Sequence, residues 1–145
     1  YVMLSQGTAF VNGGQEFLRT KRGNENSYDK SNSKASSING IDLSFKEKHS
    51  DVYNTYKGLI ALRKSNPDAF GANKDASAET VSSGVTKYTT GDFLIFFNAT
   101  EKDAVLDPKE IDGYSKVVDI ASGAPKESGG IVSSVPAKSF VILKK

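Results

Sequence analysis

Polar side chains that could form part of a substrate site follow a short apolar run near the start of the chain. Residues 9–11 are Ala-Phe-Val, and a paired glycine at 13–14 directly precedes Glu16 and Arg19. A buried strand of a barrel enzyme delivers polar groups to a cleft in this way, at its carboxyl end. The stretch could therefore supply one wall of a substrate site.

The polar stretch over residues 22–40 carries side chains suited to sugars. Amides both donate and accept hydrogen bonds, and a tyrosine ring packs on the apolar face of a sugar. For each candidate an alternative is a role inside the protein: loop stabilisation, capping of the loop, or, for the arginine, a hold on a loop carboxylate. The candidate substrate-binding residues are Arg19, Asn26, Tyr28, Asn39 and Asp42.

No catalytic residue is predicted in this chain. Glycoside hydrolysis needs two carboxyl groups, about 5–5.5 Å apart in a retaining enzyme. Glu16 has no second carboxylate at a matching strand end, so we interpret it as a structural carboxylate bonded under the loop. His49 is the only histidine and has no serine in an elbow motif to serve, so we interpret it as a surface residue at a helix start.

The chain is also poor in metal ligands. With one histidine and no cysteine, a site built on imidazole or thiolate ligands is excluded in practice. Asp29 and Asp42 offer oxygen atoms that calcium accepts, but no EF-hand spacing appears. We predict no metal site and no cofactor in this chain, although a larger parent enzyme could hold calcium.

Composition excludes several classes of partner. The 145 residues carry a net charge of +2, too little for a nucleic-acid footprint. No apolar run approaches the roughly 20 residues of a membrane span. The start Tyr1-Val2-Met3-Leu4 is neither an initiator methionine nor a signal peptide, so we expect the chain to begin inside a longer protein.

Two kinds of element must position the polar groups. Residues 50–65 have helical periodicity, with capping candidates Ser50 and Asp51, and Pro67 ends the helix. Beyond residue 71, apolar runs alternate with turns, which predicts a β-sandwich of roughly 70 residues with Phe93, Phe96 and Phe97 in its core. The predicted strands cover residues 85–88, 93–97, 114–120 and 139–143.

Several motifs occur in the order found in type I pullulanases, debranching enzymes of the α-amylase superfamily (glycoside hydrolase family 13). The first 71 residues resemble that family well, and residues 72–145 resemble it mainly in position and in their ending. The motifs are Leu4–Gly7, Gly14–Lys21 (Gly-Gln-Glu-Phe-Leu-Arg-Thr-Lys), Asn26-Ser27-Tyr28, Ser37–Asp42 and the helix segment Lys57–Lys64 with Pro67.

The resemblance implies an α+β fragment: the end of a TIM (β/α)8 barrel followed by a C-terminal antiparallel β-sandwich. Residues 8–12 would be the last barrel strand, 13–48 the loop after it and 50–65 the last helix. The domains would be 1–71, belonging to the catalytic barrel, and 72–145, the sandwich. The nucleophile, the acid/base and a third carboxylate would lie upstream of Tyr1, so the chain alone is expected to be inactive.

The same resemblance implies a parent enzyme that hydrolyses α-1,6 bonds in pullulan, glycogen or amylopectin. Its partners would be the rest of the barrel and the α-glucan, with no nucleic acid and no membrane segment in this chain. The parent would be secreted or at the cell surface, with a cytoplasmic location as the alternative.

Two other functions stay open. The chain could be a non-catalytic module that binds starch through exposed aromatic residues, for which Tyr88 and Tyr114 are the only obvious platforms. It could also be an accessory structural domain of another family 13 glycosidase.

Overall fold

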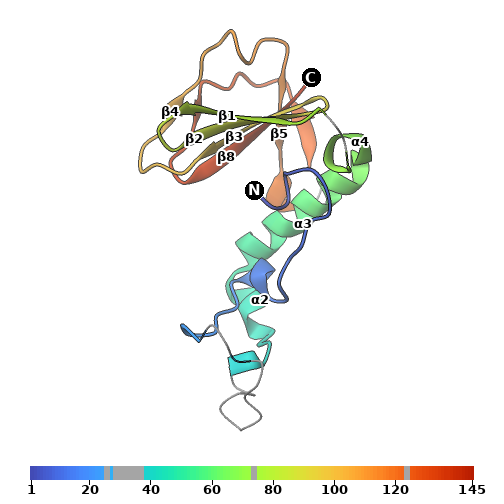
Figure 1. Cartoon of the computed structure of the whole chain (residues 1–145), viewed down its shortest axis with the longest axis vertical. Helices are drawn as coiled ribbons and strands as arrows, with labels where there is room; N and C mark the ends of the chain where they lie inside the picture. Colours follow the sequence, from blue (N-terminus) through green and yellow to red (C-terminus); the bar gives the residue numbers. More distant parts are fainter. Residues whose placement is uncertain (25–26, 28–37, 73–74, 123–124) are drawn as a thin grey trace.

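The chain forms mostly antiparallel sheet, with a few helices in its N-terminal half. The computed structural model describes residues 1–24, 27, 38–72, 75–122 and 125–145. A 3-10 turn, η1 (Gln15–Phe17), is followed by the helices α2 (Ser44–Lys48), α3 (Ser50–Ser65) and α4 (Pro67–Phe70). Figure 1 shows α3 extending away from the sheet, with the N-terminal segment running beside it.

Helix α3 confirms the prediction over residues 50–65 and ends before Asn66-Pro67, as expected. The predicted cap is wrong, because His49 is the capping residue and no side chain bonds to the free amides. The buried face is Gly58, Leu59 and Leu62, whereas Ile60 is 41% exposed. Which side of α3 is buried depends on the segments that pack against the helix.

The described strands are β1 (Ser77–Ser82), β2 (Val85–Thr90), β3 (Phe93–Asn98), β4 (Ala104–Val105), β5 (Ser115–Val118), β6 (Lys126–Ser128), β7 (Ser134–Val135) and β8 (Ser139–Lys144). Six of them form the main sheet in the order β1-β2-β3-β8-β5-β6. A second sheet pairs only β4 with β7. The predicted strands correspond to β2, β3, β5 and β8, and the predicted turn at Gly91 joins β2 to β3.

Strand β3 is buried along its whole length because both faces of the sheet are covered. Phe93, Ile95 and Phe97 pack with residues of α3, α4 and the N-terminal segment, and Leu94 and Phe96 pack with Leu106, Val132 and Val135. Alternate side chains of a strand point to opposite faces, so this one run joins two cores. The predicted core position of the phenylalanines is confirmed.

Residues 8–12 do not form the predicted strand. A backbone segment becomes a strand only when a neighbour supplies hydrogen bonds, and none of the described segments pairs with these residues. Arg63 of α3 instead holds the preceding turn, donating to the carbonyls of Met3, Ser5 and Gly7. Burial lowers the pKa of Arg63 from its ordinary value.

No helix in the described part of the chain has the length and apolar character needed to cross a membrane.

Candidate functional site

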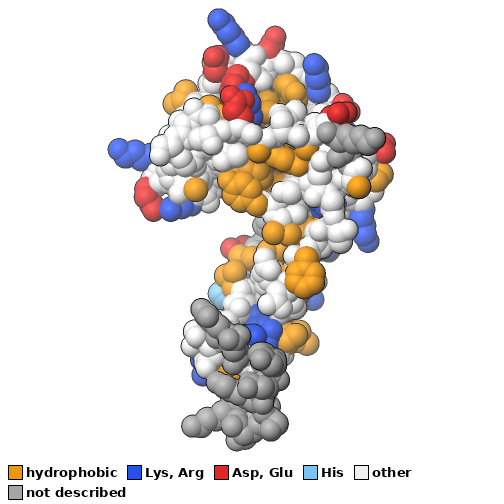
Figure 2. All heavy atoms as spheres, viewed as in Figure 1, with side chains coloured by type: hydrophobic (Ala, Val, Ile, Leu, Met, Phe, Trp, Pro, Cys, Tyr) orange, Lys and Arg blue, Asp and Glu red, His pale blue; other side chains and the backbone are white. Residues whose placement is uncertain are grey.

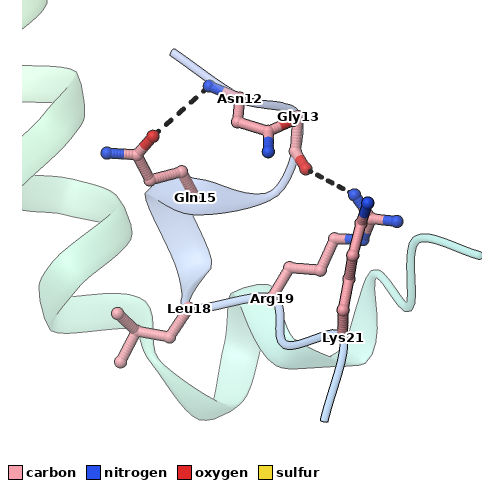
Figure 3. Close-up of a pocket in the computed structure, with 6 residues that line it drawn as sticks. All are labelled: Asn12, Gly13, Gln15, Leu18, Arg19 and Lys21. Carbon is pink, nitrogen blue, oxygen red and sulfur yellow. Dashed lines mark hydrogen bonds between the residues drawn. The ribbon is translucent and has the colours of Figure 1, made fainter. Parts of the chain in front are cut away.

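A shallow pocket of about 240 Å³ lies where the predicted polar groups follow the paired glycine. Figure 3 shows the six residues that line it: Asn12, Gly13, Gln15, Leu18, Arg19 and Lys21. Two of these are cationic and none is acidic. The pocket therefore presents donors, which suit the hydroxyl oxygens of a sugar.

Local hydrogen bonds give the pocket its shape. The turn at Gly14 has a φ of 90°, a conformation that glycine adopts without strain. Gln15 Oε1 accepts from the amide of Asn12 at 3.3 Å, and Gln15 Nε2 donates to the hydroxyl of Tyr56 in α3 at 3.0 Å. Phe17 is buried beneath the turn. The bond from Gln15 to Tyr56 thus attaches the turn to α3.

Arg19 serves the loop through backbone carbonyls. Its Nη1 donates to the carbonyl of Gly13 at 3.3 Å, and its Nη2 donates to the carbonyl of Asn39 at 2.6 Å. Its Nε is buried without a hydrogen-bond partner among the described atoms. In the described part of the chain, Arg19 therefore binds two backbone carbonyls and not the loop carboxylate that was the alternative.

Asn39 faces the polypeptide and not the pocket. Its Oδ1 accepts from the hydroxyl of Ser27 at 2.5 Å, and its Nδ2 donates to the carbonyl of Ser27 at 2.8 Å. Ser27 is 1% exposed. Three predicted residues, Asn26 and Tyr28 as sugar contacts and Asp29 as an oxygen ligand, lie outside the described residues.

Asp42 lies on an exposed turn before α2, where its Oδ1 accepts from the amide of Ser44 at 3.0 Å. Hydrogen bonds from the side chain and then the backbone of Ser44 lower the pKa of Asp42 from its usual value. This matches the capping alternative. Because the side chain is exposed, a contact of Asp42 with a sugar stays a prediction.

The carboxylate of Glu16 has a structural partner. Its Oε2 accepts from the amide of Gly14 at 3.1 Å, in agreement with the structural interpretation. His49 is half-buried at the start of α3 and packs on Phe45, with ring centroids 5.7 Å apart. Among the described residues, no group of three potential metal-ligating side chains comes together.

The aromatic residues considered as sugar platforms belong to the cores. Tyr88 and Tyr114 are partly buried against the two hydrophobic clusters. The hydroxyl of Tyr88 also accepts from the amide of Gln6 at 3.0 Å. Both rings are therefore partly covered by the protein.

Sequence reasoning did not identify Asn12, Lys21 and the carbonyl of Gly13 as pocket residues. Their position was the only signal: Asn12 and Gly13 directly precede the motif Gly14–Lys21, and Lys21 is its last residue. A backbone carbonyl leaves no trace in residue type. These parts of the site therefore become visible only in the folded turn.

No protein-family model matches the chain. Among curated proteins, pullulanase from Bacillus subtilis (strain 168) is 34% identical over 124 residues, which is 86% of this chain and 15% of that protein. Thus the chain spans a minor part of its relative's length.

The fold agrees with that sequence match. The crystal structure of type I pullulanase from Bacillus subtilis str. 168 with maltose matches 99% of this chain and 22% of its own, with a TM-score of 0.72 and 26% identity. A variant of pullulanase from Paenibacillus barengoltzii with maltotriose matches 99% of this chain and 24% of its own, with a TM-score of 0.75 and 25% identity. By sequence and by fold, the chain is therefore a relative of the type I pullulanases and corresponds to a segment of them.

Proposed function

We propose that this chain is part of a pullulanase-like enzyme that hydrolyses α-1,6-glucosidic bonds in pullulan and branched α-glucans. In this proposal, residues 1–71 contribute the last strand, loop and helix of a (β/α)8 barrel, and residues 72–145 form a C-terminal β-sandwich that braces it. The observation that carries the proposal is the match of 99% of the chain to pullulanase structures, together with 34% identity over 124 residues.

The substrate class is carried over from the relatives. Two of the matched structures contain maltose and maltotriose, which are α-glucan fragments. The donor-rich pocket beside Arg19 and Lys21 is compatible with sugar hydroxyls. We place this pocket on the wall of the glucan cleft, with the catalytic carboxylates on other parts of the enzyme.

The exposed apolar side chains support the proposal that another part of the enzyme packs against the N-terminal half of this chain. Among the described residues, seven of the ten large exposed hydrophobic side chains lie within residues 1–71, including Phe10 at 84% and Leu43 at 68%. Figure 2 shows such side chains along the arm that α3 forms. Apolar groups gathered on a surface commonly mark an interface. We assign this face to the rest of the barrel, whose strands would pair with residues 8–12.

A chimera tests the proposal. The matching segment of Bacillus subtilis pullulanase is replaced by this chain, and the release of reducing ends from pullulan is measured. We expect activity from the chimera, and none from this chain alone or from the host enzyme without the segment. A chimera that folds but is inert, or hydrolysis by the isolated chain, would contradict the proposal.

Affinity electrophoresis on amylopectin addresses the binding-module alternative. We expect free migration of the chain, because Tyr88 and Tyr114 are partly buried in the cores. Retardation would favour a starch-binding module. The location of the whole enzyme, secreted or at the cell surface, is part of the same proposal and is checked by fractionating cells that express it.

A further inference from the structure

The pocket after η1 carries two positive charges that have no acidic partner among the described residues. Arg19 and Lys21 both line it, and Figure 3 shows their side chains extending from the same segment of chain. Arg19 donates to the carbonyls of Gly13 and Asn39, which are neutral acceptors. The ammonium of Lys21 forms no ion pair within the described part of the chain. Both charges are therefore uncompensated there.

The carboxylate nearest to these cations in sequence is engaged elsewhere. Glu16 is the only acidic residue within residues 1–24, and its Oε2 accepts from the amide of Gly14 at 3.1 Å. Glu16 does not line the pocket. An anion that entered the pocket would therefore meet both cations without repulsion from an acidic lining residue.

The remaining lining residues are neutral, and the pocket is small. The carboxamide of Gln15 is fixed by its bonds to the amide of Asn12 and the hydroxyl of Tyr56, so this side of the pocket is formed before any ligand arrives. The volume of about 240 Å³ is below the range of roughly 300–1,000 Å³ found for sites that enclose a drug-sized ligand. The pocket therefore suits one small group of a larger molecule.

The charge of the pocket selects the kind of group. The hydroxyls of an α-glucan are neutral and do not require two cations. A carboxylate carries one negative charge, whereas a phosphate monoester carries about −1.5 to −2 at pH 7, which matches the two cations. Guanidinium and ammonium groups both bind phosphate oxygens through charge-assisted hydrogen bonds.

We propose that this pocket binds a phosphate monoester carried by the α-glucan, with Lys21 and Arg19 as its cationic contacts. Free phosphate has the same chemistry, and the experiments below distinguish the two sources. The inference rests on the proposed function, because that function supplies the glucan as the carrier of the phosphate.

Binding is measured on the 145-residue chain by following its backbone amide signals in NMR titrations. The ligands are glucose 6-phosphate, inorganic phosphate and glucose. We expect glucose 6-phosphate to shift the signals of Gly13, Leu18 and Lys21, which line the pocket, and glucose to leave them unchanged. The affinity should fall as salt is added, because salt screens the charges.

Lys21→Met removes the ammonium and keeps an unbranched side chain. It should weaken the binding of glucose 6-phosphate at least about tenfold, the scale of one charge-assisted hydrogen bond. Lys64→Met is the matched control, because Lys64 is exposed on α3 and does not line the pocket, and it should leave the dissociation constant unchanged. Lys21→Gln is a second variant if Lys21→Met does not fold. Absence of binding, or unchanged affinity in the Lys21 variants, would overturn the site.

The carrier is tested by affinity electrophoresis on amylopectin that bears phosphate monoesters and on the same polymer after phosphatase treatment. We expect the phosphorylated polymer to retard the chain, Lys21→Met to abolish the retardation, and the phosphate-free polymer to let the chain migrate freely. Equal migration on both polymers, with inorganic phosphate bound as tightly as glucose 6-phosphate, would overturn the glucan as carrier and assign the pocket to free phosphate.

The chimera separates this inference from the proposed function. We expect the chimera to bind glucose 6-phosphate with the affinity of the isolated chain. A chimera that hydrolyses pullulan but does not bind this ligand would show that another part of the enzyme covers or neutralises the two cations, which overturns the phosphate site alone. Inactivity of the unsubstituted chimera on pullulan would reject the proposed function, whereas the titrations of the isolated chain do not depend on hydrolysis.

Discussion

Replacing Gly58 by alanine tests how closely α3 meets the 3-10 turn η2 (Ile120–Ser122), which follows β5. A Cβ atom at this position would lie 1.7 Å from the carbonyl oxygen of Ile120 and 2.6 Å from its carbonyl carbon. Real Cβ contacts essentially never fall below 3.0 Å, so the gap must widen by at least 3.0 − 1.7 = 1.3 Å. The obstacle is backbone, which cannot turn aside as a side chain can.

Two opposing terms set the size of the effect. Overpacking of a close contact costs about 1–3 kcal/mol, and a backbone obstacle belongs at the upper end of that range. Alanine is favoured over glycine inside a helix by about 1 kcal/mol. The difference, about 3 minus about 1, leaves a loss of about 2 kcal/mol in the free energy of unfolding.

The measurement is urea unfolding of the full chain, followed by far-ultraviolet circular dichroism. Gly129→Ala is the matched control, because a Cβ there meets nothing within 4 Å and the backbone has no positive φ. It should change stability by less than about 0.5 kcal/mol. If Gly58→Ala were as stable as the unsubstituted chain, helix propensity would outweigh the contact and the reasoning would be refuted.

Three further substitutions probe polar groups. Arg63→Lys should cost about 2–3 kcal/mol and speed proteolysis of the first seven residues, because one guanidinium donates to four carbonyls, those at positions 3, 5, 7 and 70. Asn98→Asp should cost about 2–4 kcal/mol at pH 7, because Nδ2 of the buried Asn98 donates to three carbonyls that a carboxylate would repel. Part of that loss should be recovered at pH 4 in urea unfolding, where the introduced carboxyl is protonated. Lys87→Met should cost about 1 kcal/mol below pH 10, measured by urea unfolding from pH 8 to 11.5.

The pH dependence of the Lys87 substitution follows from its partners. Hydrogen bonds from Lys87 to Glu110 and then Glu79 raise its pKa above the usual 10.5. A raised pKa in the folded state means that the stabilisation is present below the unfolded value and is lost as the pH rises through the folded one. The two proteins should therefore converge in stability above about pH 10.5.

Each of these substitutions has a control among exposed or uninvolved positions. Arg22→Lys, Asn54→Asp and Lys109→Met match the three changes in chemistry, and each should stay within about 0.5 kcal/mol of the unsubstituted chain. A loss from Asn98→Asp that is equal at both pH values would point to the missing amide donors instead of the charge. A Lys87→Met difference that persists at high pH would show that packing, and not the ion pairs, carries the effect.

The buried Asn98 also shows why a sequence motif needs a fold. Asn98-Ala99-Thr100 has the spacing of a glycosylation sequon. In the structure, Oδ1 of Asn98 accepts from the amide and hydroxyl of Thr100, and the side chain is 3% exposed. The three residues therefore form a turn that is satisfied internally.

Local patterns in the sequence determined α3, four of the strands and the double burial of β3, because periodicity and proline position act over a few residues. Strands β1, β4, β6 and β7 escaped prediction, since they are polar or very short and depend on a neighbouring strand for their hydrogen bonds. The failure of residues 8–12 to form a strand has the same cause.

For the candidate site, residue types alone indicated Arg19, Asn39 and Asp42, because amide, guanidinium and carboxylate groups are recognisable without a structure. Only the tertiary structure decided what the first two contact: Arg19 binds the carbonyls of Gly13 and Asn39, and Asn39 binds the buried Ser27. Chain folding places backbone acceptors beside side chains that are distant in sequence. No property of the individual residues encodes that distance.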